Sequence, residues 1–389
     1  MPIGLRLAQQ HLVYAAFGIY AFAIGNIFPR LPDIMEAMGV GEAALGLGLI
    51  GLPAGTLVAL TLSPPLLDRV GYRRALLTLL PLLPVAYAAA VHATGPMALF
   101  ALLFPAGLMV GATEIILNVE ADRTEAMVGR RIMNRAHSFW SFGFFGAGLF
   151  GGAMAQLGLS PQAHLALVAP LTAAATVAVL GRYEPAPART ASAETSPRFA
   201  RPTLPILVLV AVTLSAMLME GAGMDWSAIY MRSVFESGPF VAGLAVAVVG
   251  LSQAVTRFFA DSFVDRHSPS SVARVLLCLL ALGVVLVFAA RSPGLSLTGF
   301  ALIGVGCSAI FPLAMSAAAQ RTDRPAAVNV AALAQISFVA FLIGPPLLGF
   351  VAEHWGLRWT FGLGLPLVAL SFVAAGALGG RSPAAIAQR

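Results

Sequence analysis

Long runs of apolar residues fill most of the chain, and short polar stretches separate them. An α-helix needs roughly 20 mostly apolar residues to cross a hydrocarbon core about 30 Å thick. The sequence divides into about twelve runs of this length, at about 11–28, 43–67, 75–92, 97–119, 137–157, 164–181, 205–230, 240–264, 272–290, 297–319, 327–352 and 358–378. The pattern predicts an all-α membrane protein with twelve transmembrane helices and no separate soluble domain.

One charged turn occurs twice, about half a chain apart. The first, at Pro64–Arg74, contains Asp68, and the second, at Asp261–Ser268, contains Asp265. The two aspartates are 197 positions apart in a chain of 389 residues. We therefore expect one six-helix unit used twice, as two pseudo-symmetric bundles. The expected boundaries are 1–181 and 204–381 for the bundles, 182–203 for a polar, proline-rich linker and 382–389 for a cytoplasmic tail.

The composition places the whole chain in the lipid bilayer. Hydrophobic residues make up 59% of the chain and charged residues 10%, outside the usual range for soluble domains. All 23 basic residues are arginine, and they are spread over short loops. A nucleic-acid-binding protein gathers its basic residues on one face, so we expect no nucleic-acid partner.

The distribution of arginine predicts the orientation in the membrane. With Arg6 on the inner side, alternate loops place nineteen arginines inside and four outside, the four being Arg30, Arg232, Arg291 and Arg358. Because inner loops carry the excess of positive charge, both termini and the linker are expected in the cytoplasm. Residues 1–10 carry one arginine and no small-residue cleavage site, so we expect the first helix to be retained.

The sequence lacks the motifs of common enzyme and ATPase sites. It has no lysine, and hence no phosphate-binding loop that ends in lysine, and no His-Glu-x-x-His or Cys-x-x-Cys spacing. Cys278 and Cys307 lie within apolar runs, which predicts neither a disulfide nor a catalytic thiol. We expect a protein that is not an enzyme, holds no cofactor or metal, and draws any energy from a gradient.

The expected helices, the linker and the repeated Asp-Arg turn resemble the major facilitator superfamily over the whole chain. The family's loop motif is Gly-x-x-x-Asp-Arg-x-Gly-Arg-Arg, and the matching run here has Asp68, Arg69, Gly71, Arg73 and Arg74, with Pro64 at the first glycine. The second turn keeps Asp265 and Arg266, with Asp261 at its first position. The resemblance implies a conformational switch at Asp68, Arg69, Gly71, Asp261, Asp265 and Arg266.

Shorter stretches resemble a bacterial branch of this superfamily that is also similar to fucose-type sugar permeases and the rhizopine transport protein. They are residues 29–32, 131–133, 137–141, 220–221, 225–227 and 344–349. Leu103 stands where many proton-coupled antiporters have a helix-4 arginine. The resemblance implies a secondary active transporter of the bacterial cytoplasmic membrane, which moves a small organic solute by alternating access with protons as coupling ion.

Ionisable side chains at membrane depth are costly and usually face a cavity or a partner. The first helix carries Asn26 and Arg30, and the seventh carries Glu220 and Asp225. Both pairs lie at heights of about 22–30 Å along their helices, and in a two-repeat transporter these helices are equivalent and face the cavity. We hypothesise that Arg30 pairs with Asp225, or with Glu220, and closes the outer end. In the alternative, these side chains are solvated at the interface and never meet.

Glu220 is the first candidate for proton coupling. A carboxyl group in a cavity that opens to each side in turn can bind a proton on one side and release it on the other. The alternative is an acid that only holds the seventh helix to a neighbour. Glu114, Arg257 and His137 are expected near the inner third of their helices, as an ion pair or a proton relay. Helix-end capping or contact with lipid headgroups is the alternative for these three.

Further polar and aromatic groups lie on helices expected to border the cavity. They are Tyr20, Asn118, Trp140, Trp226, Tyr230, Gln253, Asn329 and Gln335. Aromatic rings beside polar groups suit a sugar-like or other small polar solute, whereas Trp226 and Tyr230 could equally form an interfacial belt. A proton-driven exporter, a lipid flippase and a membrane sensor without transport activity remain open. We expect a monomer whose partners are a small solute, protons and the lipid bilayer.

Overall fold

The computed structural model describes residues 8–187, 200–264 and 266–379, with no side-chain description for Asp261 and Ser262. All regular elements of these ranges are helices. The first half of the chain contains α1 (Gln9–Gly25), η1 (Phe28–Arg30), α2 (Leu31–Met38), α3 (Glu42–Leu49), α4 (Gly51–Leu62), α5 (Pro64–Val70), α6 (Tyr72–Ala90), α7 (Pro96–Val128), α8 (Met133–Gln156) and α9 (Pro161–Leu180). The second half contains α10 (Leu204–Asp225), α11 (Ser227–Phe235), α12 (Pro239–Val264), α13 (Pro269–Ala289), α14 (Pro293–Cys307), α15 (Ile310–Ala319), α16 (Ala326–Ser337), α17 (Val339–Trp355), α18 (Leu357–Gly362), α19 (Gly364–Ala374) and η2 (Ala375–Leu378).

Eleven helical stretches of the described chain are long and apolar enough to cross a membrane. The twelfth expected span is α8, with 24 residues, whose first turns carry the polar residues Asn134, Arg135 and His137. It packs against α1 on one side and α12 on the other, so protein rather than lipid covers much of it. The expected all-α fold with twelve transmembrane helices is confirmed.

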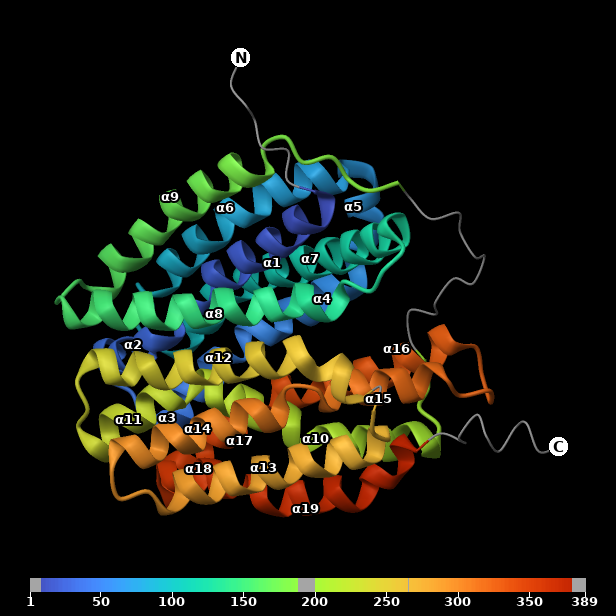
Figure 1. The fold of residues 1–389 in the computed structure, drawn as a ribbon. Coiled ribbons are helices and arrows are strands. Elements are labelled where there is room, and N and C mark those ends of the chain that lie inside the picture. Colours follow the sequence, from blue (N-terminus) through green and yellow to red (C-terminus); the bar gives the residue numbers. More distant parts are fainter. Residues whose placement is uncertain (1–7, 188–199, 265, 380–389) are drawn as a thin grey trace.

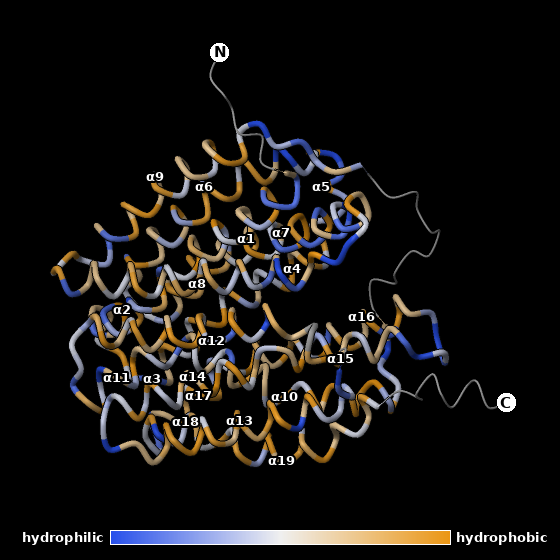
Figure 2. The backbone as a smooth tube through the Cα atoms, in the orientation of Figure 1, coloured by the Kyte–Doolittle hydropathy of each residue, from blue (hydrophilic) through white to orange (hydrophobic). Residues whose placement is uncertain are grey.

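The helices lie in two layers that follow the order of the chain (Figure 1). Helices α1 and α4–α9 form one layer, and α10–α19 form the other. Helices α2 and α3 reach across to the second layer, where α2 contacts α11 and α3 contacts α17. Hydrophobic residues run along the length of most helices, and hydrophilic residues gather at their ends and connections (Figure 2).

Two helix pairs join the layers through very close backbone contacts. Helix α8 lies along α12, where a Cβ atom on Gly243 would be 2.6 Å from the Cα of Gly152. Helix α3 lies along α17, where a Cβ atom on Gly46 would be 2.4 Å from the carbonyl oxygen of Pro345. Small residues permit this approach, as in many membrane helix pairs.

The two layers are joined at one end and diverge at the other. At the joined end, which we call the closed end, α3 packs on α17 and η1 packs on α12. At the other end, which we call the open end, α4 packs mainly on α7 of its own layer, and α16 packs on α10 and α15 of its own layer. The ribbons separate toward α5 and α16 at this end (Figure 1).

Several expected boundaries are corrected by the structure. The charged turn at Pro64–Arg74 is mostly helical, because proline is tolerated in a first turn: α5 covers Pro64–Val70, and the bend is at Gly71 with φ 85°. Helix α7 continues past Val119 to Val128 and ends at Gly129, whose φ of 70° favours glycine. The seventh span is broken at Trp226 into α10 and α11, whereas the first helix ends near the prolines at positions 29 and 32, where η1 and α2 follow α1.

Candidate functional site

A salt bridge joins two of the predicted site residues inside the second half. The Arg257 guanidinium of α12 lies 3.2 Å from the Glu220 carboxylate of α10, and both side chains are largely buried. Arg257 Nε also donates to the Ser308 carbonyl at 2.9 Å, and Arg257 Nη1 donates to Ser141 Oγ at 3.0 Å. Because Ser141 belongs to α8, this one side chain connects the two layers.

The connection continues into the first half. Ser141 Oγ donates to the His137 carbonyl at 3.2 Å, and His137 Nε2 lies 3.1 Å from Asn118 Oδ1. Asn118 Nδ2 in turn donates to Glu114 Oε1 at 2.9 Å. We call this chain of contacts, from Glu220 to Glu114, the polar network.

The structure brings together the three residues expected at the inner third, Glu114, Arg257 and His137. Tyr20 also lies beside Glu114 and donates its hydroxyl to the Val110 carbonyl at 3.2 Å. The different heights expected for Glu220, near the outer mouth, and Arg257, at the inner third, are not both correct, because the two side chains meet directly. Counting residues along a helix misplaces depth when helices tilt and differ in length; α10 has 22 residues and α12 has 26.

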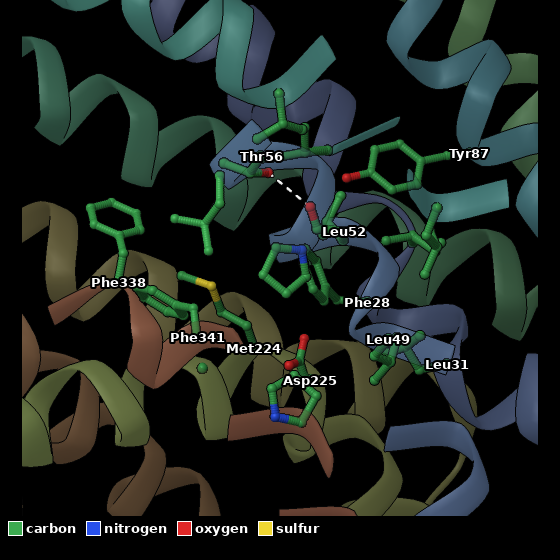
Figure 3. Close-up of a pocket in the computed structure, with 18 residues that line it drawn as sticks. Phe28, Leu31, Leu49, Leu52, Thr56, Tyr87, Met224, Asp225, Phe338 and Phe341 are labelled. Atoms are coloured by element: carbon green, nitrogen blue, oxygen red, sulfur yellow. Dashed lines mark hydrogen bonds between the residues drawn. The ribbon is translucent and has the colours of Figure 1, made fainter. Parts of the chain in front are cut away.

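A cavity of about 170 Å³ lies beside the polar network, between the two layers. We call it the apolar cavity. Its walls come from both halves and include Ile24, Phe28, Leu49, Met224, Phe338 and Phe341. Gly221, next to Glu220, and Val110, which binds Tyr20, also line it, so the cavity adjoins the network. Asp225 and the Tyr87 hydroxyl point into it from opposite sides (Figure 3).

The expected pair of Arg30 and Asp225 is not formed in this conformation. Arg30 Nε lies 3.0 Å from Asp33 Oδ2, and Arg30 Nη2 donates to the Leu159 carbonyl at 2.6 Å. The 3-10 turn at Phe28–Arg30 directs the arginine toward the α8–α9 connection rather than the apolar cavity. Arg232 of the second half lies 3.9 Å from the same Asp33. An ion pair across the layers therefore exists at the closed end, with different partners from those expected.

Other expected cavity residues pack elsewhere. Asn26 Oδ1 lies 3.0 Å from His164 Nε2 inside the first half. Trp140 stacks on Phe144 with ring centroids 5.5 Å apart. Trp226 and Tyr230 are fully buried, and Tyr230 donates its hydroxyl to the Val287 carbonyl, so neither forms an interfacial belt.

Three amides from the same expected group are also described. Gln253 is fully buried, and neither polar atom of its amide has a hydrogen-bond partner among the described residues. Gln335 accepts a hydrogen bond from the Ala200 amide at 3.3 Å. Asn329 donates to Asp323 at 3.1 Å, near the open end. None of the three lines the apolar cavity.

Three of the residues expected to form a conformational switch, Asp68, Arg69 and Arg266, lie at the open end. Asp68 and Arg69 are exposed, and Asp68 accepts a hydrogen bond from the Tyr72 hydroxyl at 3.4 Å. Arg266 is exposed as well. Asp265 and the side chain of Asp261 lie outside the described residues.

A buried acid at the open end was missed in the sequence. Glu120 is 1% exposed and accepts hydrogen bonds from the Tyr183 hydroxyl and the Ala186 amide. Burial, together with the neighbouring Glu120 carboxylate, raises the pKa of the Tyr183 phenol. Arg73 also donates to the Gly181 and Tyr183 carbonyls. These contacts fix the start of the expected linker to the first half, and no periodicity in the sequence indicates them.

Two hydrogen bonds at the closed end link the halves through helix N-termini. The Ala43 amide in the first turn of α3 donates to Glu353 Oε2 of α17 at 2.9 Å. The Phe240 amide in the first turn of α12 donates to Gln156 Oε1 of α8 at 3.3 Å. The first amides of a helix lack partners within it, and here the acceptor comes from the opposite half. We call these two contacts the cross-half caps.

The cross-half caps occupy equivalent positions of the two repeated units. Ala43 and Phe240 are 197 positions apart, as are Gln156 and Glu353, which is the spacing of the repeated Asp-Arg turn. The residues two before each amide are the glycines Gly41 and Gly238. A Cβ atom on either would lie close to the capping oxygen, at 2.7 Å and 3.3 Å respectively. The internal repeat thus extends to individual contacts between the halves.

Comparisons with known proteins agree with this architecture. The family model of the Major Facilitator Superfamily matches residues 208–388. The uncharacterized transporter y4wD of Sinorhizobium fredii is 28% identical, over 92% of this chain and 96% of its own length. An uncharacterized MFS-type transporter of Yersinia pestis is also 28% identical, over 92% of each chain. The chain is thus similar to this superfamily by its family model over the second half, and to an MFS-type transporter over nearly its whole length.

Members of the major facilitator superfamily are membrane transporters and not enzymes. The membrane protein MosC of Rhizobium meliloti is 24% identical over 84% of this chain and 79% of its own. Among solved structures, the nucleoside transporter NupG in a mutant form matches with a TM-score of 0.71 at 14% identity, over 95% of this chain and 99% of that one. A D-xylose-proton symporter matches with a TM-score of 0.69 at 12% identity, over 96% and 97%. The chain is therefore a multi-pass membrane protein that has MFS-type transporters among its relatives.

Proposed function

We propose that this protein is a proton-coupled secondary transporter of a small organic solute, which works by alternating access in the bacterial cytoplasmic membrane. The polar network is the observation that carries the proposal. It runs from Glu220 through Arg257 and Ser141 to Glu114, and so places titratable groups directly on the contact between the two halves.

Protonation of Glu220 offers a physical link between a proton and the position of the halves. A largely buried ion pair is held by mutual attraction, and removing one charge leaves the other without compensation. A proton on Glu220 therefore weakens the contact with Arg257. Arg257 is then free to change its other contacts, including the one to Ser141 in the first half. Proton binding at Glu220 thus weakens a contact that joins the two halves.

The conformation seen here fits one state of such a cycle. The closed end is joined by the cross-half caps and by the Arg232–Asp33 contact. The arginine-rich connections expected in the cytoplasm, including that of Arg73 and Arg74, lie at the open end. With that orientation, the structure represents the inward-facing state, with its outer side closed.

The shared fold of a proton symporter supports proton coupling, and the geometry is compatible with transport of the solute in either direction. A D-xylose-proton symporter shares the fold, so proton coupling is compatible with this architecture. The same geometry serves import and export, because the direction follows the gradients and whether solute and proton bind together or in turn. Proton-driven export is thus the second candidate.

Proton entry into liposomes tests the proposal. Purified protein is reconstituted with a pH-sensitive dye inside, and a panel of amines, sugars and nucleosides is added under a pH gradient. Solute-dependent proton flux is expected for the native protein, and Glu220→Gln should lower it to the level of empty liposomes. The matched variant Glu36→Gln changes an exposed acid of α2 and should retain the flux. A Glu220→Gln protein with full, pH-dependent flux would refute the coupling role.

A further inference from the structure

We propose that the apolar cavity binds an organic cation with a compact apolar body, such as a small aryl-alkyl amine, with Asp225 as its counter-ion. This proposal rests on the proposed function, because it names the substrate class of the same space between the halves. It goes beyond the sequence expectation of a sugar-like solute.

The walls of the cavity suit an apolar body. They consist mainly of aliphatic and aromatic side chains from both halves, with Phe28, Phe338 and Phe341 among them (Figure 3). At about 170 Å³ the space is close to an engineered apolar protein cavity of about 150 Å³ that takes up benzene. A sugar or nucleoside would leave several hydroxyl groups without hydrogen-bond partners against such walls. The walls therefore favour one ring or a short branched chain.

Asp225 supplies the charge for the other end of the ligand. It is the last residue of α10, and its carboxyl group points into the cavity. Among the described residues no arginine or histidine forms a salt bridge with it, and the expected partner Arg30 is bound to Asp33. An ionised carboxylate in a largely apolar space needs a compensating positive group. A bound ammonium group would provide one.

Tyr87 is a second polar group that lacks a partner at the same place. Its side chain is fully buried, and its hydroxyl has no hydrogen-bond partner among the described residues. The hydroxyl points toward the cavity from the side opposite Asp225 (Figure 3). An ammonium group has several N–H donors and no acceptor, so it can bind the carboxylate and the tyrosine oxygen together. The phenylalanine rings can add cation–π attraction.

The charged groups near the cavity also favour a cationic ligand. Glu114, Glu220 and Asp225 place three carboxyl groups in this part of the described chain, and Arg257 is the guanidinium that faces them. Carboxyl groups thus outnumber the guanidinium in this part of the described chain, which favours cations and protons over anions. The site is therefore expected to reject a carboxylate of the same shape.

Three probes of similar shape test the proposal on the purified native protein in nanodiscs. They are 2-phenylethylamine, 2-phenylethanol and phenylacetate, which carry a positive, a neutral and a negative group on one apolar body. Isothermal titration at pH 7 should show saturable binding of the amine, at least about tenfold weaker binding of the alcohol and none of the acid. Equal binding of the alcohol, tight binding of the acid, or no saturable binding of the amine would overturn the proposal.

Substitutions assign the binding to this cavity. Asp225→Asn should remove the preference for the amine over the alcohol. Tyr87→Phe should weaken binding of the amine, but the amine should still bind more tightly than the alcohol. Asp323→Asn changes an exposed loop acid and serves as the matched control with native binding. Unchanged amine binding by Asp225→Asn would exclude this site. If that variant fails to fold, the order of the three probes on the native protein still decides the charge preference.

The two proposals fail separately. Glu220→Gln should lose solute-dependent proton flux but still bind 2-phenylethylamine, because its carboxylate belongs to the network. Amine binding without any proton flux in the native protein would refute proton coupling and leave the amine site intact. Proton flux with a sugar or nucleoside, without amine binding, would refute the amine site and leave proton coupling intact.

Discussion

At the scale of single residues, Arg257 has the most consequential contacts in the described chain. Its guanidinium binds Glu220, Ser141 and the Ser308 carbonyl at once. We expect Arg257→Gln to lower the free energy of unfolding by about 3 kcal/mol, because Glu220 is left largely buried without its partner. The double variant Arg257→Gln with Glu220→Gln should regain most of this loss, since it leaves no uncompensated charge. Chemical unfolding in detergent, followed by tryptophan fluorescence, measures both.

The control for this prediction is an arginine without a structural role. Arg291 is exposed in the α13–α14 connection, and Arg291→Gln should change the free energy of unfolding by less than about 0.5 kcal/mol. Equal unfolding free energies for the single Arg257 variant and the double variant would contradict the ion-pair argument. Transport by the double variant should be lost even where its stability is regained.

The sequence indicated which residues belong to the site better than it indicated which of them are in contact. Glu114, Glu220 and Arg257 were identifiable because charges are rare in apolar runs. Their connection depends on how helices tilt and rotate against each other, which residue spacing within one helix does not contain. For the same reason Arg30 was assigned to Asp225, although the 3-10 turn directs it to Asp33.

At the scale of helices, the cross-half caps predict how firmly the two layers are joined at the closed end. Each cap satisfies a backbone amide of α3 or α12 with a side chain from the opposite half. Loss of one helix cap typically costs about 0.5–2 kcal/mol, and here the loss falls on the closed conformation alone. We therefore expect Gln156→Ala and Glu353→Ala to shift the population toward a conformation that is open at this end, each by a factor of up to about tenfold. Distances between spin labels on α3 and α17 report the shift.

The two capping residues occupy equivalent positions of the repeat, so each variant serves as a check on the other. Gln156 and Glu353 are repeat equivalents, so either variant should open the closed end in the same direction, and the double variant should open it further. Glu36→Ala removes an exposed acid of α2 at the same end and should leave the distances unchanged. Shorter label distances in either cap variant would refute the role of the caps.

The number of helices was predictable, whereas an interruption without proline was not. Apolar runs of sufficient length indicate a span whatever its partners are. Breaks such as the one between α10 and α11 carry no proline, and they depend on packing against neighbouring helices. Proline at the start of α5 was read as part of a loop, although a first helical turn accepts it. Local signals therefore predicted the spans and missed the break at Trp226.

At the scale of the whole molecule, the internal repeat relates the ends of the two halves. Gln156 on α8 caps α12, and its equivalent Glu353 on α17 caps α3. Each half thus provides one side-chain oxygen that accepts a hydrogen bond from a helix N-terminus of the other half. Such a reciprocal arrangement lets the closed end form or separate as a unit, because both contacts depend on one relative movement of the layers.

The state assigned to this structure depends on which end of the molecule faces outward, and cysteine labelling tests this. In a protein carrying Cys278→Ser and Cys307→Ser, Gly294→Cys places a thiol in the exposed first turn of α14, and Thr322→Cys places one in the exposed α15–α16 connection. A Cβ atom on Gly294 would meet no atom within 4 Å. The excess of arginine in alternate loops predicts that the first site lies outside and the second inside. A membrane-impermeant maleimide should label Gly294→Cys in intact cells and Thr322→Cys only after the membrane is opened. The reverse pattern would make the open end outward-facing and invert the state assigned to this structure.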